Sequence, residues 1–216
     1  MELRVQLNRF EDTVREYESR PVETGGLLLY GSSFFTNWGY ERAARHLEGV
    51  CDNTVCHGIG GGTVDELLYY YGRLVYPYKP AAIVLRTGAN DLFHDYTPAE
   101  AADLTVRLCE WARTDFPRVR IIVLPIFDFP SAPSRPKHKL FAPYNMLLKA
   151  YADRTPGVDY LDIGQYLYTD PAYIGTFDHF RDVFGPDGLH LTDAGYEAFA
   201  PWFRDTLKQI LSEVPA

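Results

Sequence analysis

The stretch "LLLYGSSFFTNW", residues 27–38, runs from four apolar residues through a glycine and two adjacent serines into two aromatic residues. Its apolar beginning predicts a buried strand. Because Gly and Ser are common turn residues, the simplest interpretation is a strand followed by an ordinary turn. The second interpretation is that Gly31 lets the backbone bend tightly and the turn presents the Ser33 hydroxyl at the edge of a sheet.

Four more apolar runs lack the alternation of a half-exposed strand, and helical patterns separate them. Strands buried on both faces are typical of a parallel sheet covered by helices. The five predicted strands are residues 27–30, 50–56, 81–88, 119–126 and 158–163. We therefore predict an α/β fold, a three-layer α/β/α sandwich with a five-stranded parallel sheet, in a single domain over residues 1–216.

Amphipathic patterns occur at both ends of the chain. In residues 2–18 the apolar positions are three or four apart, which predicts an amphipathic helix within residues 1–20. Near the other end, Thr192 is the expected N-cap of a last helix, and Pro201 is expected to kink or interrupt it. The two predicted apolar stripes are Leu3, Leu7, Phe10, Val14 and Tyr17, and Tyr196, Phe199, Phe203, Leu207 and Ile210.

Residues 127–143, "FDFPSAPSRPKHKLFAP", contain four prolines and four basic residues. This composition predicts a long ordered loop. Such loops in compact domains are often lids or binding loops, so we consider a lid over the substrate and a surface loop without a role.

The charge balance excludes one class of partner. With 21 basic and 29 acidic residues the net charge is −8, which opposes binding to a phosphate backbone, so we expect no nucleic acid partner. No apolar run approaches the roughly 18–20 residues needed to cross a bilayer, so membrane insertion is not expected. The N-terminal residues lack the apolar segment of a secretory signal, which favours a cytoplasmic protein. The sequence leaves the oligomeric state open.

The three cysteines, Cys51, Cys56 and Cys109, are odd in number and lack a CxxC pair. We interpret them as small buried residues in a reducing compartment, with a Cys51–Cys56 disulfide as the alternative. The six histidines show no spacing typical of a zinc site, so we expect no metal.

Four polar segments are expected at one edge of the predicted sheet. They are residues 31–33, 57–63, 87–92 and 185–192. Ligands of open parallel sheets bind outside the carboxyl ends of the strands, where these segments are expected to meet. Together they supply a hydroxyl, a glycine-rich backbone, a side-chain amide and an Asp/His pair.

Each group has a role in acyl transfer. A serine hydroxyl becomes a good nucleophile when a neighbouring base takes its proton. Asp187 and His190 are three residues apart, and on a tight turn the carboxylate would orient the imidazole that serves as this base. The Asn90 amide, the glycine-rich turn and the N–H group of Ser33 would form an oxyanion hole.

Other interpretations of the same residues are structural. A lone Asp-x-x-His pair is common in ordinary turns, and Asn90-Asp91 is also typical of an Asx turn or a helix cap. The segment "GIGGGT" is similar to a dinucleotide-binding turn but lacks its third glycine and an acidic partner for the ribose.

In combination, these segments resemble the four blocks of the SGNH hydrolases, the GDSL-type esterases and lipases. The blocks carry Ser, Gly, Asn, and His with its Asp, and they fall here at Ser33, Gly61, Asn90 and Asp187/His190. The resemblance covers about residues 25–93 and 119–205. It is closest to the branch whose first block reads G-S-S.

The resemblance implies a flavodoxin-like fold, no cofactor, and a role for each matched residue. Ser33 would be the nucleophile, His190 the general base and Asp187 its orienting acid. The N–H groups of Ser33 and Gly61 and the side chain of Asn90 would form the oxyanion hole, with Gly60 and Gly62 as competitors for the glycine position.

Three positions depart from the common pattern of these hydrolases. Ser32 stands where most members have Asp, Gly62 where many have a second Asp, and Cys56 where an Asn often opens the second block. None of the three is a proposed catalytic group, so we expect activity to survive.

We therefore expect a serine hydrolase that cleaves small-molecule carboxylic esters with short acyl groups, such as acetyl on a sugar or another metabolite. One alternative is a lysophospholipase or thioesterase that uses the same residues on longer chains. The other is a non-catalytic binding protein on the same scaffold, which would have a displaced His190 or an unreactive Ser33.

Overall fold

The computed structural model describes residues 6, 8–176 and 178–213. Five parallel strands form one sheet in the order β2-β1-β3-β4-β5. They are β1 (Leu27–Gly31), β2 (Thr54–Gly58), β3 (Ala82–Arg86), β4 (Arg120–Val123) and β5 (Val158–Tyr160). The α-helices are α1 (Glu11–Glu18), α2 (Ser33–Trp38), α3 (Tyr40–His46), α4 (Val64–Leu74), α5 (Ala89–Phe93), α6 (Pro98–Asp115), α7 (Arg135–His138), α8 (Phe141–Arg154) and α9 (Asp193–Ser212).

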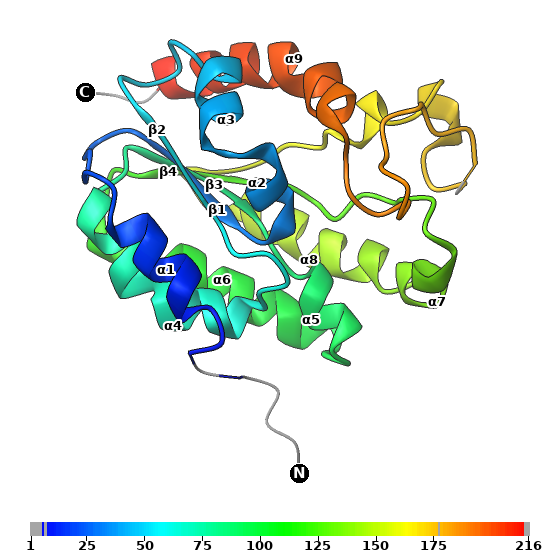
Figure 1. Cartoon of the computed structure of the whole chain (residues 1–216), viewed down its shortest axis with the longest axis horizontal. Coiled ribbons are helices and arrows are strands. Elements are labelled where there is room, and N and C mark those ends of the chain that lie inside the picture. Colours follow the sequence, from blue (N-terminus) through cyan, green and yellow to red (C-terminus); the bar gives the residue numbers. More distant parts are fainter. Residues whose placement is uncertain (1–5, 7, 177, 214–216) are drawn as a thin grey trace.

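Helices cover both faces of this sheet (Figure 1). α2, α3 and α9 lie on one face, and α4, α6 and α8 lie on the other, with α1 packed outside α4. The predicted three-layer α/β/α sandwich with a five-stranded parallel sheet is therefore confirmed.

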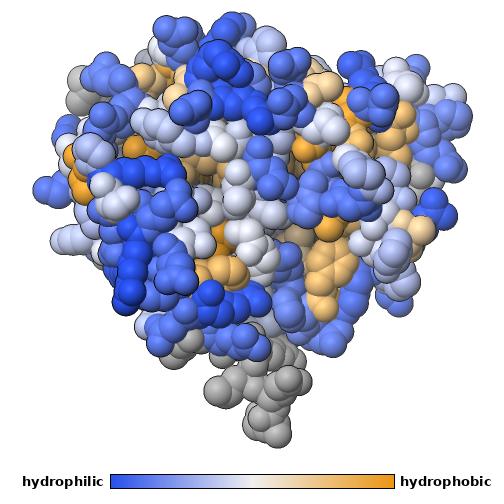
Figure 2. All heavy atoms as spheres, in the orientation of Figure 1, coloured by the Kyte–Doolittle hydropathy of each residue, from blue (hydrophilic) through white to orange (hydrophobic). Residues whose placement is uncertain are grey.

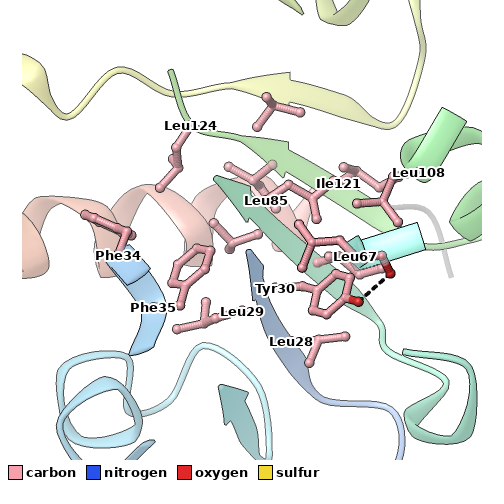
Figure 3. Close-up of a cluster of buried hydrophobic side chains, with 14 of the residues drawn as sticks. Leu28, Leu29, Tyr30, Phe34, Phe35, Leu67, Leu85, Leu108, Ile121 and Leu124 are labelled. Carbon is pink, nitrogen blue, oxygen red and sulfur yellow. Dashed lines mark hydrogen bonds between the residues drawn. The ribbon is translucent and has the colours of Figure 1, made fainter. Parts of the chain in front are cut away.

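The core centres on β1, in which every residue is buried. Figure 3 shows Phe35 of α2 beside Leu29 of this strand, and Phe34 belongs to the same buried cluster. Tyr30 is fully buried, and its hydroxyl donates a 2.7 Å hydrogen bond to the carbonyl oxygen of Leu67 in α4. This bond satisfies a polar group that would otherwise destabilise the core. On the face shown in Figure 2 the surface is mostly hydrophilic, with small hydrophobic patches between hydrophilic side chains.

Two predicted elements begin several residues later than expected. β2 starts at Thr54, because the chain bends at residues 50–52 in place of the first half of the predicted strand. α1 starts at Glu11, because residues 8–10 form a turn in which Asn8 has a φ of 73°. The predicted positions Leu3 and Leu7 lie outside the described residues.

Of the two effects expected of Pro201, an interruption of the last helix is wrong, since α9 continues through it, and a kink stays a prediction. A proline inside a helix leaves the carbonyl four residues earlier without its donor. Here that residue is Glu197, which is exposed like Pro201, so water can bind the free carbonyl. Thr192 is the N-cap as predicted, but its hydroxyl donates to the carbonyl oxygen of Val183. Of the predicted stripe, only Ile210 is not buried.

All three cysteines are free thiols, so the alternative of a Cys51–Cys56 disulfide is wrong. Burial raises the pKa of both Cys56 and Cys109 to about 12, which makes them unreactive at neutral pH. Within the described part of the chain, no helix has the length and apolar character that crossing a bilayer requires.

Gly31 is required by close packing between strands, not by the tight bend that we expected. A Cβ atom at this position would lie 2.3 Å from the carbonyl oxygen of Arg86 in β3. We therefore expect Gly31→Ala to push β1 and β3 apart and lower the free energy of unfolding by about 1–3 kcal/mol or more.

The matched control is Gly72→Ala. Gly72 lies on the exposed side of α4 with open space around it, so the same substitution should stabilise the protein by up to about 1 kcal/mol. Thermal unfolding of both variants tests this. Equal changes in melting temperature would show that the close approach at Gly31 does not matter.

Candidate active site

The hydroxyl that the sequence singled out lies at the carboxyl edge of the sheet. Ser33 is the first residue of α2, two residues after the end of β1, and it is partly exposed. Ser32 is the N-cap residue and is buried. The short segment between strand and helix therefore fixes the position of Ser33 while leaving its hydroxyl accessible.

Asp187 and His190 lie on a turn that precedes α9, and they approach Ser33 from the far end of the chain. The His190 Nδ1 atom is 2.6 Å from Asp187 Oδ2, and the His190 Nε2 atom is 3.1 Å from Ser33 Oγ. The other oxygen of Asp187 accepts hydrogen bonds from the backbone N–H groups of Leu189 and His190, at 2.9 and 3.0 Å. The structure thus brings together the three residues that the sequence predicted.

The charge on Asp187 determines how the imidazole is protonated. The two backbone N–H donors and the His190 ring lower the pKa of Asp187 to about 2. An ionised carboxylate can only accept hydrogen bonds, so Nδ1 of His190 carries the hydrogen of that pair. In the neutral ring, Nε2 is then an acceptor for the Ser33 hydroxyl, which is the arrangement that lets a histidine take a serine proton.

The glycine-rich turn after β2 and the start of α5 lie beside Ser33. Gly60, Gly61 and Asn90 line the same cavity as Ser33. The Asn90 side chain is held in place because its Nδ2 atom donates a 2.8 Å hydrogen bond to the Gly62 carbonyl oxygen. An amide nitrogen has two hydrogens, so one of them remains for a ligand.

The turn also distinguishes between the three glycines. The N–H group of Gly62 donates to the Ile59 carbonyl oxygen at 2.9 Å and is therefore already used. No acceptor for the N–H groups of Gly60 and Gly61 occurs among the described residues. The hydrogen bonds therefore favour Gly60 and Gly61 over Gly62 as the glycine that donates to a ligand, and the choice of Gly61 stays a prediction.

Asp91 caps a helix, which was one of the structural interpretations of the Asn90-Asp91 pair. Its Oδ1 atom accepts a 3.0 Å hydrogen bond from the N–H group of Val64, the first residue of α4. The cap interpretation is therefore correct for Asp91, although the helix it caps is α4 and not its own. This bond ties the helix that follows the glycine-rich turn to the segment that carries Asn90.

These groups surround a cavity of about 360 Å³. Its apolar wall includes Phe34, Phe93, Phe127, Phe129, Leu189 and Leu191. In the part of the chain that the structure describes, no group of three or more His, Cys, Asp or Glu side chains could hold a metal ion.

The predicted loop over residues 127–143 contributes to this cavity. It contains the 3-10 turn Ala132–Ser134 and the helix α7, and its last three residues begin α8, so it is less irregular than expected. Phe127 and Phe129 line the cavity, and the N–H group of Ser131 donates to the Gly188 carbonyl oxygen at 2.8 Å. The loop is thus attached to the turn between Asp187 and His190, and its role as a lid stays a prediction.

Arg86, the last residue of β3, also lines the cavity and was not predicted from the sequence. The signal was a single basic residue at the end of an otherwise apolar run, "AAIVLR". Phe127 and Phe129 could not be predicted as cavity residues either, because nothing in the loop sequence shows which of its aromatic residues turn inward.

The chain is similar to known proteins in sequence and in fold. The model of the GDSL-like Lipase/Acylhydrolase family matches residues 24–198. No curated protein matches the chain.

Three solved structures illustrate the likeness in fold. A candidate platelet activating factor from Streptococcus pneumonia is 22% identical, with a TM-score of 0.76 over 93% of this chain and 94% of that one. A candidate acylhydrolase from Bacteroides fragilis is 18% identical, with a TM-score of 0.76 over 96% and 99% of the two chains. An acetylxylan esterase from Geobacillus stearothermophilus is 20% identical, with a TM-score of 0.62 over 87% and 96%. At these identities the likeness supports the fold alone.

The buried carboxyl of Asp91, which links α4 to the segment of Asn90, makes the stability of the protein depend on pH. Burial raises the pKa of Asp91 from its ordinary 3.8 to about 7, although the Val64 N–H group acts in the opposite direction. The folded protein therefore holds a proton that the unfolded chain releases between about pH 4 and pH 7, and stability from this group falls as pH rises through that window.

We expect Asp91→Asn to remove the part of the pH dependence of stability that Asp91 causes. The asparagine carbonyl can still accept from Val64 without a buried charge, so the melting temperature of the variant should exceed that of the wild type by more at pH 8 than at pH 5. Thermal unfolding across this range measures the difference. If the melting temperatures of the two proteins differed by the same amount at every pH, a raised pKa of Asp91 would be contradicted.

Proposed function

Because this chain belongs to the GDSL-like lipase/acylhydrolase family, we propose that it is a serine esterase that hydrolyses carboxylic esters with short acyl groups through an acyl-enzyme. The observation that carries this proposal is the chain of contacts from Asp187 through His190 to the Ser33 hydroxyl. A displaced His190, which a non-catalytic binding protein would have, is not observed.

The first half of the reaction forms the acyl-enzyme. Ser33 Oγ attacks the carbonyl carbon of the ester while its proton passes to Nε2 of His190. The carbonyl oxygen becomes an oxyanion, which accepts hydrogen bonds from the N–H groups of Ser33 and Gly61 and from the Asn90 amide. The oxyanion then reforms the carbonyl, the bond to the alcohol oxygen breaks, and the alcohol leaves with the proton from His190.

The second half releases the acid. Water attacks the acyl carbon and gives a proton to His190, a second oxyanion forms in the same position, and the bond to Ser33 Oγ breaks. Ser33 recovers the proton from His190. In both halves Asp187 stays ionised, holds the ring in the productive orientation and stabilises its protonated form.

The size of the cavity favours short acyl groups. At about 360 Å³ it is at the lower end of the volumes found for small-molecule sites, and phenylalanine side chains form part of its wall. An acetyl group on a sugar or another small metabolite fits this description. A lysophospholipase or thioesterase would need a longer apolar groove beside Ser33.

The first test is turnover of 4-nitrophenyl acetate, butyrate and octanoate. We expect kcat/KM to fall from acetate to octanoate, and we expect Ser33→Ala to lose activity by about 10³-fold or more because the nucleophile is gone. Equal turnover by wild type and Ser33→Ala would contradict the proposed function, and a preference for octanoate would favour the lysophospholipase or thioesterase.

The second test concerns the oxyanion hole. Asn90→Ala removes a donor whose hydrogen bond strengthens as negative charge develops, so kcat should fall by about 10²–10³-fold with little change in KM. Asn90→Asp keeps the shape of the side chain but opposes the oxyanion, so its kcat should be at least as low. A change confined to KM in both variants would show that Asn90 only binds substrate.

A further inference from the structure

Arg86 places a positive charge inside the cavity that contains Ser33. It is the last residue of β3, and its register partner on β1 is Gly31, two residues before the nucleophile. The residue is only 7% exposed, yet it lines the cavity together with Ser33 and His190. A charged side chain in such a position needs an explanation, because removing a charge from water is unfavourable unless a partner compensates it.

The structure provides aromatic rings but no anion for this charge. The centre of the guanidinium group is 4.8 Å from the ring centroid of Phe34 and 4.2 Å from that of Phe127. No described residue forms a hydrogen bond or an ion pair with the Arg86 side chain, and its Nε atom is buried without a partner. Cation–π contacts stabilise the group, but they leave its N–H donors unused.

Other partly buried arginines differ in this respect. Arg9, Arg73 and Arg120 each form ion pairs with acidic side chains, and Arg42 pairs with Asp193. Among the described residues that line the cavity there is no aspartate or glutamate, and the residue before the nucleophile is the neutral Ser32. Burial lowers the pKa of Arg86 to about 10, so the group still carries its charge at neutral pH.

We propose that Arg86 binds a compact oxyanion group of the substrate, so that the preferred esters carry a carboxylate or a phosphate near the scissile bond. This inference rests on the proposed esterase function and narrows its substrate class. The planar guanidinium offers paired N–H donors that match the oxygens of a carboxylate or a phosphate. Phe34 and Phe127 hold its plane in place, and the free donors remain available to a ligand in the cavity.

The test compares charged and neutral esters in pairs. For an anion on the acyl side, the pair is 4-nitrophenyl hydrogen glutarate and its methyl ester. The rate of hydrolysis is measured by the release of nitrophenol. For an anion on the alcohol side, 3-acetoxybenzoate is compared with its methyl ester, and 3-acetoxyphenyl phosphate is compared with phenyl acetate. The rate of hydrolysis is measured by the release of acetate. In at least one pair we expect the anionic ester to have a kcat/KM higher by about tenfold or more, as expected for a charge-assisted hydrogen bond.

Variants of Arg86 connect this preference to the residue. Arg86→Gln should abolish the preference for the anionic ester, and Arg86→Lys should retain part of it. The matched control is Arg42→Gln, since Arg42 lies over Tyr196, another residue of the cavity wall, but pairs with Asp193. This control should keep the preference. No preference in any pair, or a preference that persists in Arg86→Gln, would overturn the inference while leaving the esterase function intact.

Binding is measured separately from turnover, so that the two proposals fail independently. In the Ser33→Ala background, glutarate and inorganic phosphate are added and the melting temperature is recorded. We expect at least one of the two anions to raise it, and the added Arg86→Gln substitution to remove the increase. If the anions raise the melting temperature of Ser33→Ala and of the Ser33→Ala/Arg86→Gln double variant equally, Arg86 is not an anion site. The same conclusion holds if they raise neither. If no ester is hydrolysed through Ser33, the proposed function fails whatever the anions do.

Discussion

The register of β1 between its two neighbours is the constraint on which the site depends. Gly31 is level with Gly58 of β2 on one side and with Arg86 of β3 on the other, so three parallel strands end at the same height. The segments that follow them carry the proposed nucleophile Ser33, the glycine-rich turn and the side-chain amide of Asn90. A shift of one residue in this pairing would turn every side chain of β1 to the opposite face of the sheet.

Hydrogen bonds, and not strand pairing, attach the start of α4 and the turn of Asp187 and His190 to this edge. Asp91 links the start of α4 to the segment of Asn90, and Tyr196 of α9 donates a 2.7 Å bond to the Phe34 carbonyl oxygen in α2. The second bond matters because α9 follows directly on the turn with Asp187 and His190. Residues from opposite ends of the chain are thereby held within hydrogen-bonding distance.

Much of this arrangement could be predicted from the sequence, for physical reasons. Continuous apolar runs identify strands buried on both faces, and the ends of parallel strands must meet at one edge, so Ser33, Asn90 and the Asp187/His190 pair could be placed together before any coordinates. Local signals failed where tertiary context decides. The helix continues through Pro201, where the carbonyl left without a donor belongs to the exposed residue Glu197. The environment of Arg86 comes from the rings of Phe34 on α2 and Phe127 on a distant loop.

The most direct measurement is the site of covalent labelling by a fluorophosphonate, which reacts with serines that a neighbouring base activates. The labelled protein is digested and the modified peptide is sequenced by mass spectrometry. We expect a single adduct on Ser33 and none on the adjacent Ser32, because only the Ser33 hydroxyl contacts His190. An unlabelled Ser33, or an adduct on another serine, would contradict an activated nucleophile at this position.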